Sequence, residues 1–400
     1  MRSATSPLAS DPSGGIRFTV VGNPGNRRIA LFAGAVRAAG LPPPRVLPWL
    51  DVACGRVVVE AGALVRIDSP GEDGEVDRRF RDAVEPIEHG RIESFTGWYR
   101  GFQAALARLG DGLAGTPGVE VLNRPDDLAV MFDKPRTAGR LAAAGVPLPP
   151  ALGPVAGWEE LRATLAAAGW SRAFLKPAHG SSASGVVALA IAGGRVRATT
   201  SVELVRCGRG VRLYNSLMVR TYDDERDVAT IVDALGADRV HVERWLPKAG
   251  LDGRVIDLRV VVIAGRPTHA VVRASRSPLT NLHLGNQRGD VTRLRAAMGE
   301  RTWAAAMVSC VRAAACFPRT LQVAVDLLLA PGWRRHAVAE VNAFGDLLPG
   351  VLAGGRDTYA EQVDAVRCGR HHAWARAAGS LSRRAEHHDA VGQEVVPCTT

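Results

Sequence analysis

Three oxygen-bearing side chains near the C-terminal end of the chain have the spacing of a metal site on a β-hairpin. Asp326 lies in the apolar run QVAVDLLL, and Glu340 and Asn342 lie in HAVAEVN. Residues two apart in a strand face the same side, so Glu340 and Asn342 point together. If the turn between the runs centres near Trp333, Asp326 lies directly opposite Glu340, with Cβ atoms about 5 Å apart.

Two carboxylates in this arrangement need a positive charge between them, because like charges placed opposite one another destabilise a sheet. Hard oxygen ligands suit Mg²⁺, particularly when it bridges to the phosphates of a nucleotide. The pattern therefore predicts that Asp326, Glu340 and Asn342 bind Mg²⁺. The alternative is a solvated strand face that carries ordinary surface acids.

Lysine is rare in this chain: only three of the 50 basic side chains are lysines. Two of them, Lys134 and Lys176, lie in the similar blocks FDKP and FLKP. A lysine retained in an arginine-rich chain is a candidate for a function that the planar guanidinium fork cannot fulfil, such as a point charge on one phosphate oxygen. Drift alone is the alternative explanation.

A loop rich in glycine and serine follows the second lysine block. Small residues from Gly180 to Gly185 allow backbone N–H groups to approach phosphate oxygens, and the hydroxyls of Ser181 and Ser182 add donors. Such loops are more often plain hairpin connections, unless a lysine and a metal site accompany them. We interpret His179 as a loop residue satisfied by the backbone.

The segment VHVERWLP reads as a short strand that breaks at Pro247. The break would leave the main-chain groups of Glu243, Arg244, Trp245 and Leu246 free to pair with an adenine edge, with Trp245 or Leu246 as an apolar wall. Taken alone, the segment reads equally as an ordinary edge strand.

Arg259 and Arg273 lie on two runs that read as consecutive antiparallel strands joined by AGRP. If both face a cleft, they supply bidentate donors for phosphate or carboxylate oxygens. Asn281 and His283 follow in TNLHLG. In an arginine-rich chain each of these residues also fits a solvated surface.

Size and composition limit the class of protein. The chain has 400 residues, of which 46% are apolar and 22% charged, as in soluble globular proteins with two or three subdomains. No apolar run approaches the roughly 20 residues that cross a bilayer, and none follows a basic start, so we expect a cytoplasmic protein that binds no membrane. The six cysteines form no Cys-x-x-Cys pair and predict neither a zinc site nor disulfides.

The net charge of +10 favours anionic ligands. The arginines are spread along the chain and aromatic residues make up only 5% of it, so we expect no nucleic-acid partner. The sequence leaves the oligomeric state open.

The patterns predict a disordered N-terminus at 1–15, an α/β domain at 16–125, a larger α+β block at 126–368 and a C-terminal tail at 369–400. The elements expected in the first domain are strands at 16–21, 57–59 and 63–67 and helices at 28–39 and 98–109. Those expected in the second are helices at 134–144 and 296–316, strands within 173–191, a region of strands and loops at 202–240, strands at 255–263 and 269–274, and the hairpin at 321–341.

Taken in order, these blocks resemble the ATP-grasp superfamily, most closely the branch that contains glutathione synthetase and the ligases that add glutamate to a ribosomal protein. The resemblance covers roughly residues 126–359. It depends on the order of the motifs DK with GVPLP, LKP with the Gly/Ser loop, ERWL, DLR, TNLHLG, VDL and EVN. It implies an ATP-grasp architecture, α/β plus α+β, in which an N-terminal Rossmann-like lobe precedes two α+β subdomains that clasp ATP.

The resemblance also implies a role for each candidate residue. ATP and Mg²⁺, or Mn²⁺ in its place, would be the cofactors. The nucleotide would be held by Lys134, Lys176, Gly180, Ser181, Ser182, Gly185, Glu243, Arg244, Trp245 and Leu246. The metal would be held by Asp326, Glu340 and Asn342, and the transferred phosphoryl and acyl groups would lie near Arg259, Arg273 and Asn281.

Family chemistry implies that ATP phosphorylates a carboxylate to an acyl phosphate, which an amine or thiol then attacks. The substrates would be small molecules or peptides. A kinase-like use of the fold and an ATP-binding regulatory protein are the alternatives. In the first domain the substrate candidates are Asn23 to Asn26, Arg66, Asp68 and Trp98 to Arg100, with turn and core roles as the alternative for each.

Overall fold

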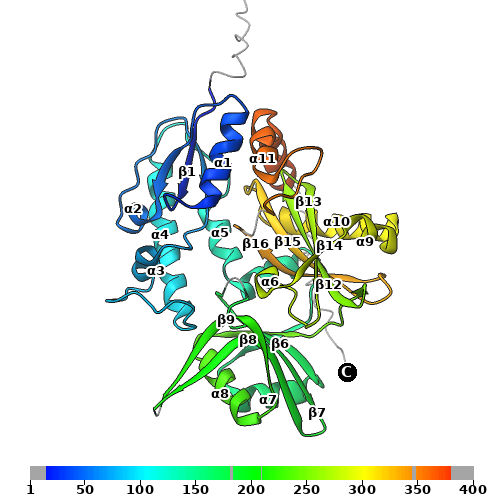
Figure 1. Ribbon diagram of the computed structural model, residues 1–400. Helices are drawn as coiled ribbons and strands as arrows, with labels where there is room; N and C mark the ends of the chain where they lie inside the picture. The colour runs from blue at the N-terminus through cyan, green and yellow to red at the C-terminus, as the bar shows by residue number, and fades with distance from the viewer. Residues whose placement is uncertain (1–14, 181–182, 209, 345–347, 380–400) are drawn as a thin grey trace, which may run out of the picture.

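The computed structural model describes residues 15–180, 183–208, 210–344 and 348–379. Figure 1 shows three parts: an N-terminal lobe in blue and cyan, a middle part in green, and a C-terminal part in yellow and orange. Each part is built on one β-sheet. Helices α5 and α6 lie near the centre of the molecule, where the three parts meet (Figure 1).

The N-terminal lobe has a parallel sheet with the strand order β2-β1-β3-β4. The strand β1, with the sequence FTVVG, is buried along its whole length, as expected for a strand covered on both faces. The strands are β1 Phe18–Gly22, β2 Arg45–Pro48, β3 Leu64–Ile67 and β4 Glu120–Val121. Its helices are α1 Arg27–Ala38, α2 Trp49–Ala53, α3 Gly74–Phe80 and α4 Phe95–Ala114, and the central helices α5 Pro125–Met131 and α6 Lys134–Ala143 follow β4.

One strand expected in this lobe is absent from the structure. Residues 57–59 are not in a strand. Val57 packs against α4 instead, so closely that a Cβ atom on Gly112 would lie 2.6 Å from Val57 Cγ1. The prediction was wrong because an apolar run that contacts a helix has the same pattern as a short buried strand.

The middle part has an antiparallel sheet with the order β5-β10-β6-β7-β8-β9, and α7 and α8 lie on one face of it (Figure 1). The strands are β5 Ala151–Val155, β6 Arg172–Pro177, β7 Val187–Ala192, β8 Arg195–Cys207, β9 Gly210–Tyr222 and β10 Val240–Arg244. The helices are α7 Trp158–Ala167 and α8 Glu225–Gly236. The helix α8 corrects the expectation of strands and loops over 202–240: its buried residues recur at helical spacing, at Val228, Ile231, Val232 and Leu235.

The C-terminal part has a sheet with the order β14-β13-β12-β15-β16, and β11 pairs with β12. Its strands are β11 Gly250–Leu251, β12 Arg254–Ile263, β13 Arg266–Ser275, β14 Gln287–Gly289, β15 Gln322–Leu329 and β16 His336–Asn342. Its helices are η1 Leu282–Leu284, α9 Val291–Met298, α10 Glu300–Ala315 and α11 Thr358–Arg367. The helix expected at 296–316 is interrupted at Gly299, which has φ 74° and ends α9 before α10 begins.

The described residues form two hydrophobic cores. One joins the N-terminal lobe to the C-terminal part, from Phe18 to Ala378, and the other lies within the middle part. A helical segment at 370–379 is packed onto the first core by Trp374, whose indole N–H donates to the carbonyl oxygen of Thr320 at 3.2 Å. The folded chain therefore extends past residue 369, where the tail was expected to begin.

Candidate functional site

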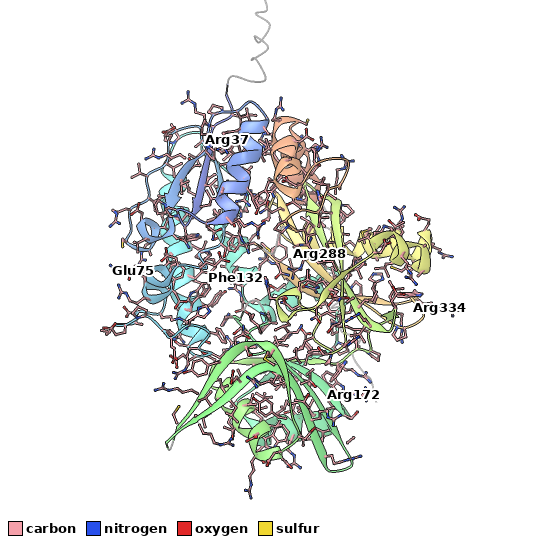
Figure 2. The ribbon with its side chains drawn as sticks, viewed as in Figure 1. Arg37, Glu75, Phe132, Arg172, Arg288 and Arg334 are labelled. Carbon is pink, nitrogen blue, oxygen red and sulfur yellow. The ribbon has the colours of Figure 1, made fainter. Side chains whose placement is uncertain are left out.

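A cavity lies where the three parts meet, and all three contribute to its wall. The N-terminal lobe contributes Arg28, Trp98 and the turn at 69–71, and the middle part contributes Phe174. Phe132, labelled near the centre of the molecule in Figure 2, adds an apolar surface. Seven basic and four acidic side chains line the cavity, so its excess of positive charge favours an anionic ligand.

All three lysines of the chain line this cavity. The structure brings the predicted pair, Lys134 and Lys176, to it from α6 and β6. The Nζ of Lys134 donates to the carbonyl oxygen of Gly180 and lies 3.5 Å from Glu340 Oε1. Asp133 caps α6 by accepting a backbone N–H of the first turn, so the start of the helix determines the position of the lysine.

Lys176 forms a buried ion pair with Glu243: Nζ lies 2.6 Å from Oε2, and the other carboxylate oxygen lies 3.2 Å from His241 Nε2. Burial acts to lower the pKa of Lys176, but the carboxylates of Glu243 and Glu340 outweigh it and the pKa is raised. For Glu243 burial acts to raise the pKa, and Lys176 and His241 lower it to about 2. Both groups are therefore charged at neutral pH.

The hairpin pairs as predicted, with Asp326 opposite Glu340. Nearer the turn Leu327 pairs with Val338, so an uninterrupted ladder would place Ala339 opposite Asp326. A β-bulge shifts the register by one residue and brings Glu340 into that position. The bulge also frees the carbonyl oxygen of Ala339, which accepts a hydrogen bond of 3.3 Å from the lysine of β6.

Two arginines bind Asp326. They lie on the consecutive antiparallel strands β12 and β13 and both line the cavity, which confirms their predicted placement. Arg259 binds it in a bidentate manner at 2.6 and 2.8 Å, and Arg273 Nη1 lies 3.0 Å from Oδ2. Burial acts to raise the pKa of Asp326, but the two guanidinium groups lower it. Arg273 also binds Asp257 through Nε at 2.6 Å, so the two arginines and two aspartates form one buried network.

The third lysine, Lys248, was missed by the sequence reasoning, although its rarity was the same signal that singled out the other two. Its Nζ donates to the hydroxyl of Thr280 at 2.6 Å and to the carbonyl oxygen of Pro278 at 3.1 Å, and it lies 3.2 Å from Asp257 Oδ2. Burial lowers the pKa of this lysine. Asn281, which caps η1 through the N–H of the residue two positions on, lines the cavity next to this cluster.

The oxygen-bearing trio has donors that fit Mg²⁺. Asp326, Glu340 and Asn342 all line the cavity. The Nδ2 atom of Asn342 is buried and has no hydrogen-bond partner among the described residues. Rotation of the amide group would place the carbonyl oxygen at the same point, where it could meet a cation. Hard oxygen donors from two carboxylates and one amide are a set that Mg²⁺ accepts.

The predicted adenine hinge only partly faces the cavity. Glu243 and Arg244 line it, whereas Trp245 and Leu246 are not among the lining residues. The prediction that the main-chain groups here are free was wrong for two of them, because the N–H of Arg244 donates to the carbonyl oxygen of Pro150 at 2.8 Å and that of Trp245 to the carbonyl oxygen of Arg172 at 3.3 Å. The apolar wall is Phe174, whose ring packs on Trp245 in a tilted arrangement with the centroids 5.2 Å apart.

The glycine-rich loop begins in the cavity wall. Gly180 lines the cavity, and Gly185 has φ 72° with Pro177 so close that an added Cβ atom would lie 2.6 Å from its Cγ. Ser181 and Ser182, predicted to contact phosphates, lie outside the described residues. His179 is buried against Tyr99 in a parallel stack at 3.9 Å, with Nδ1 3.3 Å from the carbonyl oxygen of Phe132, as expected of a residue satisfied by the backbone.

Most of the substrate candidates predicted in the N-terminal lobe lie behind the wall of the cavity and do not line it. Asn23 donates to the carbonyl oxygens of Pro70 and Gly71 at 2.9 Å, and so holds the turn that lines the cavity. Arg66 and Asp68 form a buried ion pair at 2.7 Å and do not line it. Among the other candidates, Trp98 lines the cavity. Arg28, which the sequence reasoning missed, reaches the cavity from α1 and donates to the carbonyl oxygen of Phe344.

None of the helices in the described ranges combines the length and the apolar character of a membrane span. No family model and no curated protein matches the sequence. Solved structures do match the fold. D-cycloserine synthetase DcsG overlays with a TM-score of 0.52 at 17% identity, over 88% of this chain and 99% of that one.

Two more solved structures have similar coverage. The macrocyclase MdnC from Microcystis aeruginosa MRC, bound with precursor peptide MdnA, gives a TM-score of 0.50 at 12% identity, over 88% of this chain and 100% of that one. The ATP-grasp ligase PsnB, complexed with precursor peptide PsnA2 and AMPPNP, gives 0.48 at 19% identity, over 90% and 99%. The chain shares the fold of DcsG and MdnC, in agreement with the ATP-grasp architecture that the order of its motifs predicted.

Proposed function

We propose that this protein is an ATP- and Mg²⁺-dependent ligase that activates a carboxylate as an acyl phosphate for attack by an amine or thiol. The observation that carries the proposal is the convergence of all three lysines with Asp326, Glu340 and Asn342 on one positively charged cavity. The ATP-grasp fold supports it. Ligation of the kind carried out by the glutathione synthetase branch is the specific form that we propose.

The first task of the chain would be to hold a triphosphate. Lys134 and Lys176 reach the cavity from different elements, and each has a carboxylate or carbonyl partner that a phosphate oxygen can replace. The backbone at Gly180 lies beside Lys134 and offers the start of a loop over the phosphates. Phosphoryl transfer requires mainly positioning and charge neutralisation, which these groups supply.

The second task is to bring the acid to the γ-phosphate. Asp326, Glu340 and Asn342 would hold Mg²⁺, which when bound polarises the phosphoryl oxygens and shields their charge. Arg259 and Arg273 lie beside Asp326 and can orient an anionic acid or stabilise the transferred group. The acid oxygen attacks the γ-phosphorus as ADP leaves, and the amine or thiol then attacks the acyl carbon as phosphate leaves.

The acid would enter from the side of the N-terminal lobe, where Arg28, Trp98 and the turn at 69–71 line the cavity. One protein of the same fold was solved with a peptide bound, and another is a synthetase of a small molecule. We therefore propose a peptide or small-molecule acid. We propose that the two domains that share this site meet at residue 125, and that the second includes the helical segment at 370–379.

The test is turnover by the purified full chain. We expect ADP and phosphate to form in equal amounts when ATP, Mg²⁺ and the correct acid and nucleophile are present, in a screen of amino acids and short peptides. Mass spectrometry should show a product joined with loss of water. The variant Asp326→Asn should lose this turnover, and Asp223→Asn, which removes an exposed ion pair with Arg197, should retain it.

Two outcomes would redirect the proposal. A stable phosphorylated product with ADP but no free phosphate would indicate kinase chemistry. Tight binding of ATP without turnover across the screen would favour a regulatory nucleotide-binding protein. Turnover that survives both chelation of Mg²⁺ and the Asp326→Asn substitution would contradict the assigned site.

A further inference from the structure

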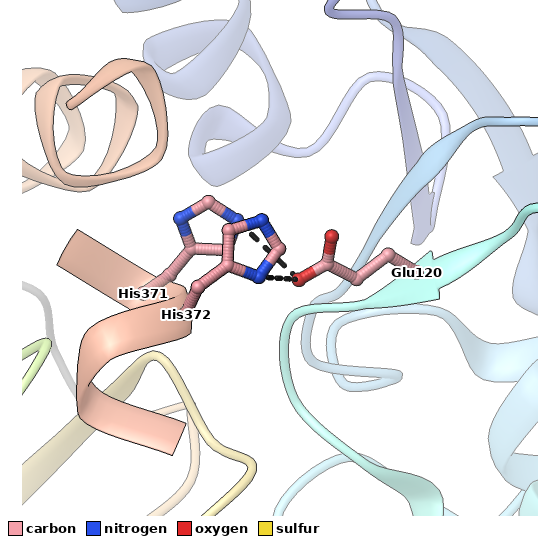
Figure 3. A group of neighbouring side chains, drawn as sticks. All are labelled: Glu120, His371 and His372. Atoms are coloured by element: carbon pink, nitrogen blue, oxygen red, sulfur yellow. Dashed lines mark ion pairs between the residues drawn. The ribbon is translucent and has the colours of Figure 1, made fainter. Parts of the chain in front are cut away.

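A second cluster of ligand-type side chains lies outside the cleft, between the N-terminal lobe and the end of the described chain. Glu120 lies on β4, and His371 and His372 lie in the first turn of the helical segment 370–379 (Figure 3). The three side chains point toward one another in Figure 3. None of them lines the cavity that holds the lysines.

The spacing of the three groups fits a metal ion better than an ion pair. His371 Nε2 and His372 Nδ1 each lie 3.3 Å from the same oxygen, Glu120 Oε1, and one ligand atom from each residue lies within 4.8 Å of the others. With bonds of about 2.0–2.2 Å, two ligands of a tetrahedral zinc ion are separated by roughly 3.3–3.5 Å. Good hydrogen bonds to a charged oxygen are shorter, at about 2.7–2.9 Å.

His371 gives a second, independent observation. It is only 8% exposed, and neither of its ring nitrogens makes a hydrogen bond among the described residues. Its closest polar contact is Glu120 Oε1, 3.3 Å from Nε2, and a buried imidazole without a hydrogen bond is costly unless another ligand satisfies it. The ring of His372 lies against that of His371 with the centroids 3.8 Å apart, so both imidazoles face the same point beside Glu120.

The surroundings hold the cluster in place and leave it open on one side. Trp374, one turn further along the same helix, anchors the segment through its hydrogen bond to Thr320. Glu120 and His371 line a second cavity, which leaves room for a water molecule as a fourth ligand. Arg124 and Arg319 also line that cavity; the charge of Arg124 is offset by Asp126 at 2.9 Å, and Arg319 is exposed to solvent.

We propose that Glu120, His371 and His372 form a binding site for a borderline divalent cation of the Zn²⁺ class. Two imidazoles and one carboxylate are ligands that suit Zn²⁺, whereas Mg²⁺ prefers oxygen throughout. The site would tie the edge strand of the N-terminal sheet to the helical segment that ends the described chain. It is independent of the proposed ligase chemistry.

The test uses the full chain, first freed of metals with a chelator, and Co²⁺ as the probe. Excess Mg²⁺ is present to occupy the oxygen-ligand site. We expect one equivalent of Co²⁺ to bind with the strong visible absorption of tetrahedral nitrogen and oxygen coordination, and Zn²⁺ to displace it. Zn²⁺ should also raise the unfolding temperature, because it binds only the folded arrangement.

His372→Ala and Glu120→Gln are the variants of choice, because His372 and Glu120 are partly exposed, with 52% and 37% of their side chains accessible, so both changes should leave the fold intact. Each substitution should lower the affinity for Zn²⁺ and Co²⁺ by more than the roughly 10–100-fold that loss of a hydrogen bond to a metal ligand costs. His89→Ala, at an exposed histidine outside the cluster, should behave as the wild type. Equal Co²⁺ spectra and equal Zn²⁺ affinity in wild type and both variants, or no tetrahedral spectrum in the wild type, would overturn the site.

Discussion

Two buried arginine–aspartate pairs in this molecule look alike in isolation and differ in what surrounds them. In the N-terminal lobe, Arg66 and Asp68 are 1% and 2% exposed and lie 2.7 Å apart. In the C-terminal part, Asp326 is 4% exposed and is held by Arg259 and Arg273. The second group lines the cleft that holds the lysines, and the first pair does not.

The N-terminal pair is enclosed by the protein. Arg66 donates to Gln362 at 3.0 Å, and its guanidinium group lies 4.7 Å from the centroid of Phe32. Its partner Asp68 accepts the N–H of the next residue, which begins the turn that lines the cleft. These contacts explain the pair as a support for that turn. Burial of a charge therefore does not by itself indicate a ligand site, whereas a buried charge whose partner faces a cavity does.

The largest expected effect is on Asp326. Asp326→Asn removes a charge that would bind the metal, and we expect turnover to fall by about 10³-fold or more, roughly 4 kcal/mol in the barrier. Nucleotide affinity should persist, because Lys134 and Lys176 are untouched. Phosphate release and equilibrium nucleotide binding measure the two quantities separately.

Asp68→Asn is the matched change in the N-terminal lobe. It should cost about 3 kcal/mol of stability, because Arg66 is left buried without its partner, while turnover per folded molecule changes little. Thermal unfolding alongside turnover makes the distinction. If Asp68→Asn abolished turnover at full stability, the contrast between the two pairs would be lost.

The fold and the composition of the cleft could be predicted from the sequence wherever neighbouring residues in the chain carry the signal. The alternation in QVAVDLLL and HAVAEVN fixed which faces carry Asp326 and Glu340, and the rarity of lysine pointed to the cleft. Which buried charges face the cavity depends on packing between distant segments, as with Arg66 against Gln362. The bulge at Ala339 and the role of Lys248 depend on such contacts as well, and no local spacing encodes them.

A pH experiment compares a carboxylate of the cleft with one on the surface. The pKa of Glu243 is lowered from 4.5 to about 2, so this group contributes stability that is complete above pH 4.5 and is lost as the pH falls toward 2. The contribution is about 3 kcal/mol in order of magnitude. Glu243→Gln should therefore lose less stability than the wild type over this window, as followed by chemical denaturation.

The surface control is Glu203→Gln on β8, where the half-exposed ion pair with Arg220 lies at 2.9 Å. Its stability should follow the wild-type pH profile closely, since an exposed pair contributes little. A Glu243→Gln variant that follows the wild-type profile would mean that Lys176 does not hold this carboxylate in solution.

Lysine-to-arginine exchange distinguishes two buried lysines within the cleft. Lys176→Arg keeps the charge but replaces a compact ammonium with a wide fork, and we expect about tenfold weaker ATP binding, roughly 1.4 kcal/mol. Lys248, which donates to Thr280 and Pro278 in the wall, should affect folding stability more than nucleotide affinity when it is changed to arginine. Calorimetry with a non-hydrolysable ATP analogue, paired with thermal unfolding, tests both. Equal losses of affinity would show that the two lysines have the same role.

The smallest effect concerns the glycine-rich loop and has a matched control outside the cleft. Gly185 and Gly194 have φ of 72° and 74°, so alanine strains the backbone at either site by about 1–2 kcal/mol. At Gly185 the added Cβ atom would also lie 2.6 Å from Pro177 Cγ, whereas at Gly194 nothing lies within 4 Å. We expect Gly185→Ala to be the less stable variant by about 1 kcal/mol or more and to weaken ATP binding, because Pro177 lines the cleft. Gly194→Ala should leave ATP affinity unchanged. The same loss of affinity in both variants would mean that nucleotide binding responds to backbone strain anywhere in this sheet and does not depend on the shape of the loop at the cleft.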